Sequence, residues 1–248
     1  MEFFALGFVE TIETAETAET AETVETKFIM SAPQATISSR DLELMSSGRT
    51  RLYLVRHGEL VTSHEWRYVG HMDVALNDNG RAQIARLARR LSMDKIDTLL
   101  SSDLQRTVES ACIIGRAIGL EPAAEPAFRE IHLGRWEGLT REEIIKNFPQ
   151  EFDLRSLDIP GYRIQGGESF ADMRDRVIPR LTACLEQHPG KNLLLVAHGG
   201  VNRVILCHAL GLDLNMLTRI DQAYGCLNII DFFDGVPVVR LMNETPFD

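Results

Sequence analysis

The sequence predicts an α/β protein, a three-layer α/β/α sandwich with a mostly parallel central sheet and a small cap insertion. Short apolar runs that are typical of buried strands alternate along the chain with helical segments. Strands buried on both faces belong to parallel sheets, whose two faces are covered by helices. Two final apolar runs joined through Asp234-Gly235 predict a closing hairpin. In chain order, the strands are expected over 51–56, 96–100, 192–197, 227–233 and 236–242.

Apolar stripes and end signals predict the helices. Asp103 is the expected N-cap of the second helix, and Gly119 is expected to end it. Thr140 and Glu143 have the spacing of a capping box at the start of the third helix, which should end at 148–149. Ser169 should begin the fourth helix, and Gly211 should follow the fifth. The helices are expected over 82–91, 103–118, 140–148, 169–187 and 201–210.

Residues 1–48 differ in composition from the rest of the chain. They hold nine of the 36 acidic residues and two of the 26 basic ones, and Glu-Thr recurs every third residue from Glu10 to Thr26. Such a segment offers no apolar stripe to pack, so we expect a disordered acidic tail over 1–48. Met30 and Met45 are alternative start residues. Translation from Met30 would shorten this tail, and translation from Met45 would leave nearly all of it untranslated. The domain is expected over 49–248, with a cap insertion at about 134–168.

Composition narrows the partners of the predicted domain. Residues 49–248 carry a net charge of only −3, which indicates neither a nucleic-acid surface nor a basic membrane patch. The sequence has no signal-peptide pattern and no apolar run near the ~18 residues of a membrane helix. The four cysteines show no CxxC spacing and are expected to be reduced, buried thiols. We therefore expect a cytoplasmic protein with no metal, no cofactor and a small-molecule substrate; the oligomeric state stays open.

Two of the predicted strands end in the same way. The run 52–55 is followed by Arg56-His57-Gly58, and the run 193–196 by Ala197-His198-Gly199. Ligands of open α/β sheets bind just beyond the carboxyl ends of the strands, so both imidazoles should lie in one crevice. A neutral imidazole can attack an electrophile directly, and the guanidinium of Arg56 is suited to phosphate oxygens.

A second arginine and a carboxylate complete the predicted site. Arg106 lies in the first turn of a helix that follows a strand, where free N–H groups favour an anion. With Arg56, His57 and His198 it would form a cage for a phosphoryl group without a metal. Phosphoryl transfer from an ester needs a proton on the departing oxygen. Glu130 is preferred as its donor because it follows the segment that approaches the core, although spacing does not exclude Glu137.

Five motifs in this order resemble the histidine phosphatase superfamily, also called the phosphoglycerate mutase-like family. The resemblance covers residues 51–245. Within it, the short segment between Glu130 and Gly167 resembles the phosphatase branch that includes alpha-ribazole phosphatase. Leu60 and Ser63 depart from the family pattern, which usually has Thr or Ser and then Asn at these places. The motifs are Arg56-His57-Gly58-Glu59, 101–107, 129–138, 166–169 and 196–200.

The resemblance implies a role for each residue of the cage. His57 would become phosphohistidine, while Arg56 and Arg106 would hold the phosphoryl oxygens. His198 would hydrogen-bond the transferring group, and Glu130 would act as general acid and then general base. Gly199 would offer a backbone N–H to the same phosphate. These roles predict a metal-independent phosphomonoester hydrolase of the histidine acid phosphatase type; the alternatives are a phosphoglycerate mutase and a non-catalytic phosphate-binding module.

Overall fold

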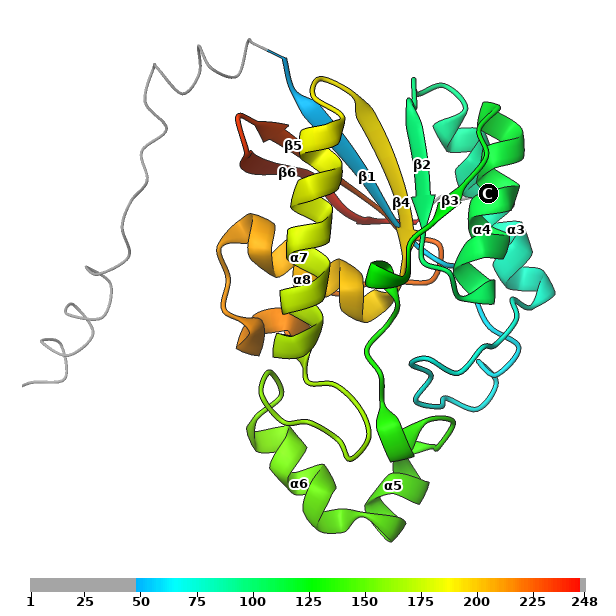
Figure 1. Cartoon of the computed structure of the whole chain (residues 1–248). Coiled ribbons are helices and arrows are strands. Elements are labelled where there is room, and N and C mark those ends of the chain that lie inside the picture. The colour runs from blue at the N-terminus through cyan, green and yellow to red at the C-terminus, as the bar shows by residue number, and fades with distance from the viewer. Residues whose placement is uncertain (1–47, 246–248) are drawn as a thin grey trace, which may run out of the picture. The chain divides into compact units, whose positions relative to one another are not determined.

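The computed structural model describes residues 48–245 and contains one six-stranded sheet (Figure 1). The strand order is β3-β2-β4-β1-β5-β6. The first four strands in this order are parallel, and β5 and β6 are antiparallel. The predicted mostly parallel sheet and closing hairpin are therefore confirmed. The strands are β1 (Thr50–Arg56), β2 (Thr98–Ser101), β3 (Ala123–Ala124), β4 (Asn192–Ala197), β5 (Leu227–Phe233) and β6 (Val236–Glu244).

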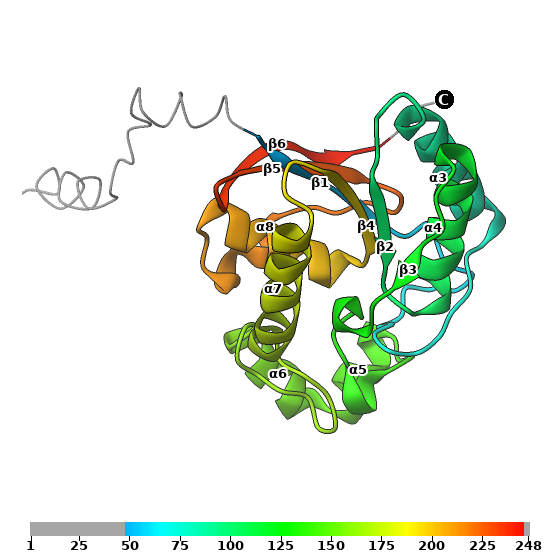
Figure 2. The same ribbon diagram turned by 45° about the horizontal axis from the view of Figure 1, so that its top comes forward.

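Helices cover both faces of the sheet (Figures 1 and 2). Alternate residues of β1 enter different cores: Leu52 and Leu54 pack on the side of α7 (Phe170–Gln187) and α8 (Gly199–Leu210). Tyr53 and Val55 pack on the side of α3 (Asp78–Leu91) and α4 (Gln105–Ile118). This alternation follows from the two-residue period of a strand, and it gives the three predicted layers.

The segment between η1 (Pro126–Phe128) and α7 holds η2 (Gly134–Trp136), α5 (Arg141–Asn147) and α6 (Pro149–Leu157). Figure 1 shows α5 and α6 below the sheet. The capping box of Thr140 and Glu143 is present at the start of α5. The sequence predicts no helix between 149 and 168, but α6 begins at Pro149, because proline is well suited to the first turn of a helix. The last short helix is η3 (Leu214–Arg219).

Three helix starts differ from the predictions. The fifth helix, α8, begins at Gly199 rather than Val201. The first helix begins at Asp78 rather than Ala82, because the Asn77 side chain accepts a hydrogen bond from Gly80 N–H at 2.7 Å and acts as the cap. Asp103 is not the N-cap of α4: its carboxylate forms an ion pair with Arg129. Instead, Asp73 accepts from the Gln105 N–H at 2.7 Å, so this helix is capped from a distant loop that local sequence signals do not reveal.

The predicted tail lies outside the described residues, apart from Gly48. No helix within 48–245 is long and apolar enough to cross a bilayer. Of the four cysteines, Cys184, Cys207 and Cys226 are buried, as expected, whereas Cys112 is half-buried.

Candidate active site

The two histidines lie side by side at the ends of two paired strands. Arg56 of β1 is in register with Ala197 of β4, so the next residue of each strand, His57 and His198, leaves the sheet at the same level. The His57 N–H donates to the Ala197 carbonyl at 3.1 Å, and the two ring centroids are 5.3 Å apart. The predicted crevice with two imidazoles is thus formed by the parallel pairing of β1 and β4.

Hydrogen bonding decides which nitrogen of His57 carries the proton. Its Nδ1 lies 2.8 Å from the carbonyl oxygen of Gly58, which can only accept. The proton is therefore on Nδ1, and Nε2 keeps its lone pair. Burial, together with the positive charges of Arg106 and Arg56, holds the pKa of His57 well below its ordinary value, so the ring is neutral.

His198 has the opposite tautomer. The buried Arg106 donates from Nε to His198 Nδ1 at 3.2 Å, so the proton of this imidazole is on Nε2. Burial lowers the pKa of His198, and the charge of Arg106 lowers it further. Its Nε2 is buried and has no hydrogen-bond partner among the described residues. A buried donor without a partner is uncommon, and here it belongs to the ring beside His57.

Arg106 is held rigidly below the crevice. Its guanidinium donates to the carbonyls of Met72 at 2.9 Å and Gly70 at 2.6 Å, and its side chain is 1% exposed. Burial lowers its pKa, while the charges of Glu130, Asp73 and Glu137 oppose that shift. The loop that supplies the two carbonyls is itself bound to α4 through Asp73, which fixes the position of this cation.

Arg56 lies on the other side of His57. Its guanidinium carbon is 3.9 Å from the centroid of the Tyr224 ring, and Nη1 donates to the Gln222 carbonyl at 2.5 Å. Its Nε is buried without a partner among residues 48–245. A Cβ at Gly199 would lie 3.3 Å from this Nε, so the glycine lets the start of α8 approach the guanidinium closely.

Glu130 brings a carboxylate to the same crevice. Its Oε2 accepts from the Gly200 N–H at 2.9 Å, and its Oε1 accepts from the Ile131 N–H at 2.9 Å. The first of these bonds ties the carboxylate to the first turn of α8, one residue from Gly199. Glu130 therefore lies next to the helix start that follows His198.

Glu137, the other carboxylate considered, has a different environment. Its two oxygens accept from the backbone N–H groups of residues 70, 71, 72 and 133 at 2.7–3.1 Å. These four bonds use the carboxylate to shape the loop whose carbonyls hold Arg106. Glu137 does not line the crevice, and its geometry is that of a structural group.

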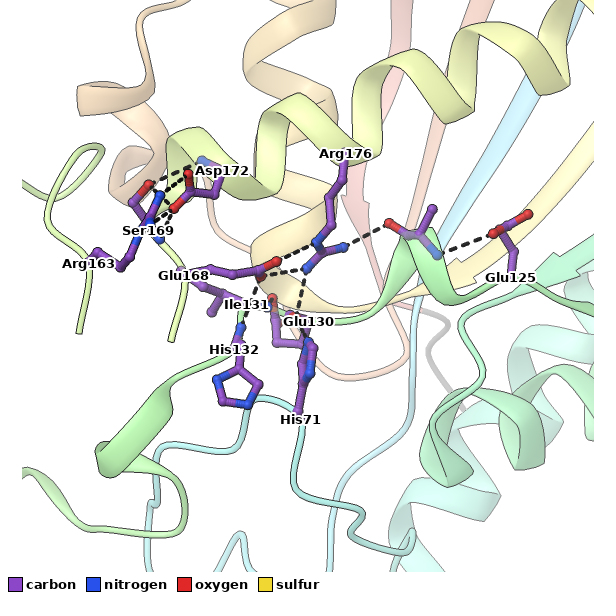
Figure 3. Close-up of polar contacts among 11 residues, drawn as sticks. His71, Glu125, Glu130, Ile131, His132, Arg163, Glu168, Ser169, Asp172 and Arg176 are labelled. Atoms are coloured by element: carbon purple, nitrogen blue, oxygen red, sulfur yellow. Dashed lines mark hydrogen bonds and ion pairs between the residues drawn. The ribbon is translucent and has the colours of Figure 1, made fainter. Parts of the chain in front are cut away.

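The backbone of Glu130 is held from behind by a network that the sequence reasoning missed (Figure 3). Arg176 of α7 forms an ion pair with Glu168 at 2.8 Å and donates to the Glu130 carbonyl at 3.0 Å. His71 Nε2 donates to the same carbonyl at 2.8 Å. Glu168 also accepts from the His132 N–H at 3.1 Å, so both sides of the segment are fixed. The sequence signal for this network is the motif around Glu168. It indicates the start of a helix, but it does not show that Glu168 lies behind Glu130.

A pocket of about 210 Å³ is lined by Arg56, His57, Glu130 and Gly199, whereas His198 and Arg106 are buried and do not line it. Among residues 48–245, Glu130 is the one side-chain carboxylate on its wall, whereas the wall carries several guanidiniums. Leu60 and Ser63, the two departures from the family pattern, also line it, and the Ser63 hydroxyl donates to Glu59. The cationic and imidazole lining consists of Arg56, His57, Arg67, Arg155 and Arg203. Within 48–245, no group of three or more His, Cys, Asp or Glu side chains could hold a metal ion.

Residues 52–245 match the model of the histidine phosphatase superfamily, branch 1. The chain belongs to this superfamily. Phosphoglycerate mutase-like protein 4 of Arabidopsis thaliana is 41% identical over 159 residues, which are 61% of this chain and 67% of that protein. Phosphoserine phosphatase 1 of Hydrogenobacter thermophilus is 33% identical over 178 residues, 72% of this chain and 82% of the relative.

Solved structures support the assignment of this chain to the histidine phosphatase superfamily. The alpha-ribazole phosphatase of Shigella flexneri has a TM-score of 0.73 and 25% identity, covering 78% of this chain and 96% of that one. A mycobacterial glucosyl-3-phosphoglycerate phosphatase has a TM-score of 0.73 and 26% identity, covering 79% of this chain and 99% of that one. The family and these relatives make the protein a phosphatase or mutase enzyme.

Proposed function

We propose that the protein is a metal-independent phosphomonoesterase that reacts through a phosphohistidine at Nε2 of His57. One observation carries the proposal: Nδ1 of His57 lies 2.8 Å from the Gly58 carbonyl, which binds its proton, so the lone pair is on Nε2 of a residue that lines the pocket. Burial and the charges of Arg106 and Arg56 lower the pKa of His57, which favours the neutral ring. A neutral imidazole oriented in this way is a nucleophile that needs no further activation.

In the first step, the Nε2 lone pair attacks phosphorus and the bond between phosphorus and the ester oxygen breaks. The electron pair of that bond stays on the departing oxygen, which takes the proton of Glu130. In the second step, Glu130 accepts a proton from water while the water oxygen attacks phosphorus. The bond between phosphorus and nitrogen breaks, its electron pair returns to His57, and inorganic phosphate leaves.

The remaining groups stabilise the negative charge of the phosphoryl group. Arg56 Nε and His198 Nε2 are buried donors without a partner among the described residues, and phosphoryl oxygens would satisfy both. Arg106 supplies positive charge and keeps the tautomer of His198. The Gly199 N–H, at the start of α8, adds a donor at the positive end of the helix dipole.

The decisive test is the covalent intermediate. Brief incubation with a 32P-labelled phosphate ester should leave label on the protein that is stable in alkali and lost in acid. His57→Ala should abolish both the label and turnover, whereas Glu130→Gln should slow both steps. Retention of turnover by His57→Ala would show that the mechanism is wrong.

A phosphoglycerate mutase remains the second candidate because the 41% identical plant relative is mutase-like. Incubation with 3-phosphoglycerate separates the two: a phosphatase releases inorganic phosphate, and a mutase forms 2-phosphoglycerate. Vanadate binding without turnover of any ester would indicate the phosphate-binding module instead. The likeness to an alpha-ribazole phosphatase and a glucosyl-3-phosphoglycerate phosphatase makes alpha-ribazole 5′-phosphate and sugar or glycerate phosphates the first substrates to test.

A further inference from the structure

The guanidinium of Arg56 is oriented by neutral groups. It donates to the Gln222 carbonyl at 2.5 Å, and its central carbon lies 3.9 Å from the centroid of the Tyr224 ring. Within residues 48–245, this guanidinium makes no other hydrogen bond and no ion pair with a carboxylate. The carbonyl of residue 222 is therefore the fixed acceptor that sets the direction of the guanidinium.

The carbonyl and the ring both belong to one irregular segment, residues 221–226, which lies between η3 and β5. The Cys226 carbonyl accepts from the Arg56 N–H at 3.1 Å, and the Gly225 N–H donates to the His57 carbonyl at 3.0 Å. No helix or strand fixes the segment itself. The direction of the acceptor carbonyl therefore depends on the side chains that hold this segment.

A buried cluster of three amide side chains holds the segment: Asn202 of α8, Gln222, and Asn228 of β5. Gln222 Oε1 accepts from Asn202 Nδ2 at 3.0 Å and from Asn228 Nδ2 at 2.9 Å. Gln222 Nε2 donates to Asn228 Oδ1 at 2.8 Å, so these two amides bind each other reciprocally. Asn228 Nδ2 also donates to the Leu54 carbonyl at 3.0 Å. The amide cluster thus ties the segment to α8, to β5 and to β1, the strand that ends at Arg56.

Amides in a protein interior lower stability unless hydrogen bonds satisfy them, whereas apolar side chains carry no such cost. Hydrogen bonds, however, have preferred directions, so a polar network can fix one arrangement of a segment that apolar packing would leave free. Asn202 Oδ1 is buried and has no partner in the part of the chain that the structure describes, so this amide is kept at a cost. That cost indicates a function for the amide cluster other than stability.

We propose that Gln222, Asn202 and Asn228 are positioning residues, which turn the Gln222 carbonyl toward Arg56 and thereby aim the guanidinium at the transferring phosphoryl group. The inference rests on the proposed phosphatase function. None of the three amides lines the reaction pocket. Because the carbonyl holds Nη1, the buried Nε of Arg56 is left for a phosphoryl oxygen. The amide cluster affects the reaction only through Arg56, and this dependence can be measured.

A double-mutant cycle with Arg56 tests the proposal on the full chain. Gln222→Met replaces the amide with an apolar side chain of similar length. We expect kcat/KM for p-nitrophenyl phosphate and the affinity for vanadate to fall about 10- to 100-fold, the cost of misplacing a group by about 1 Å. In the Arg56→Met background, the same change should alter either quantity less than about threefold. Equal losses in both backgrounds, or a lower Tm with kcat/KM and vanadate affinity unchanged, overturn the inference.

Asn202→Ala keeps the test decisive if Gln222→Met does not fold, and it is compared in the same two backgrounds. It removes an amide whose oxygen has no partner, and alanine favours the helix, so Tm should change little. Gln222 loses one donor, and kcat/KM should fall about threefold to tenfold, the range of one neutral hydrogen bond. An unchanged kcat/KM and vanadate affinity, or an equal loss without Arg56, again overturns the inference.

Asp231→Asn is the matched control. Asp231 is also a buried polar residue of β5, but its ion pairs join it to Arg51, at the far end of β1 from the crevice, and to Arg240. This change should lower Tm and leave kcat/KM and vanadate affinity unchanged. If the unaltered protein turns over no ester and forms no phosphohistidine, the proposed function fails, whereas the vanadate cycle still decides whether the amides position Arg56.

Discussion

Gly200→Ala should lower kcat about 100-fold without unfolding the protein, because the new methyl group would displace the Glu130 carboxylate. A Cβ at Gly200 would lie 2.3 Å from Glu130 Oε1 and 3.2 Å from Met173 Cε, whereas ordinary contacts begin at 3.4 Å. The carboxylate would have to shift by about 1 Å, and a misplacement of that size costs catalysis roughly 10²-fold. The displaced atom is the end of a flexible side chain, so the fold itself can accommodate the change.

A double-mutant cycle checks this reasoning with phosphate release from a turned-over ester. Glu130→Ala, Gly200→Ala and the double variant are compared, with thermal unfolding of each as the stability control. If the methyl group acts through the carboxylate, Gly200→Ala should cost little in the Glu130→Ala background. An equal loss in both backgrounds, or full activity of Gly200→Ala, would refute the reasoning.

Three further predictions concern stability. Glu137→Ala should lower the free energy of unfolding by about 1–3 kcal/mol, because four backbone donors lose their acceptor; urea denaturation measures this, and an unchanged midpoint would contradict it. Asp73→Ala should lower the free energy of unfolding by about 0.5–2 kcal/mol, because α4 loses its cap, whereas Asp103→Ala should not remove a cap. Hydrogen exchange measures the protection of the α4 amides in both variants. An equal loss of protection in the two would argue against Asp73 as the cap. The third is pH dependence: with the pKa of His57 and of His198 lowered, the unfolded chain binds more protons than the folded chain below pH 6.5. The free energy of unfolding should therefore fall from pH 7 to pH 5, by up to about 2.7 kcal/mol per pH unit for two protons, and less steeply in His57→Asn; a flat profile would exclude neutral buried imidazoles.

Much of the fold could be predicted from local signals. The apolar runs before His57 and His198 mark β1 and β4 because strands buried on both faces must be apolar throughout. The hairpin of β5 and β6 follows from its turn residues. The start of α4 could not be predicted locally, because its cap is Asp73, 32 residues away in the sequence. Asp103 has the right residue type, but its ion pair with Arg129 competes for the carboxylate.

The candidate site divides in the same way. Residue types and their positions after strands indicated Arg56, His57, Arg106, Glu130 and His198 before any contact was known. The sequence favoured Glu130 as the proton donor, but spacing alone did not exclude Glu137. The structure places Glu130 at the pocket wall and surrounds Glu137 with backbone donors. The loop of residues 70–72 folds back on the segment around residue 133, and the backbone N–H groups of both bind Glu137. This packing decides which of the two carboxylates lines the pocket.

The sequence alone determined that two His-Gly strand ends and two arginines would meet at one edge of a parallel sheet, because strand patterning and topology follow from local apolar runs. Tertiary structure alone decided the tautomers of His57 and His198, since each depends on a neighbour: the Gly58 carbonyl and Arg106 Nε. It also brought Arg155 of α6 to the same pocket wall as Arg203 of α8. Hydrogen-bond partners and unpaired charges are properties of neighbours in space, and neighbours in space are set only when the whole chain has packed.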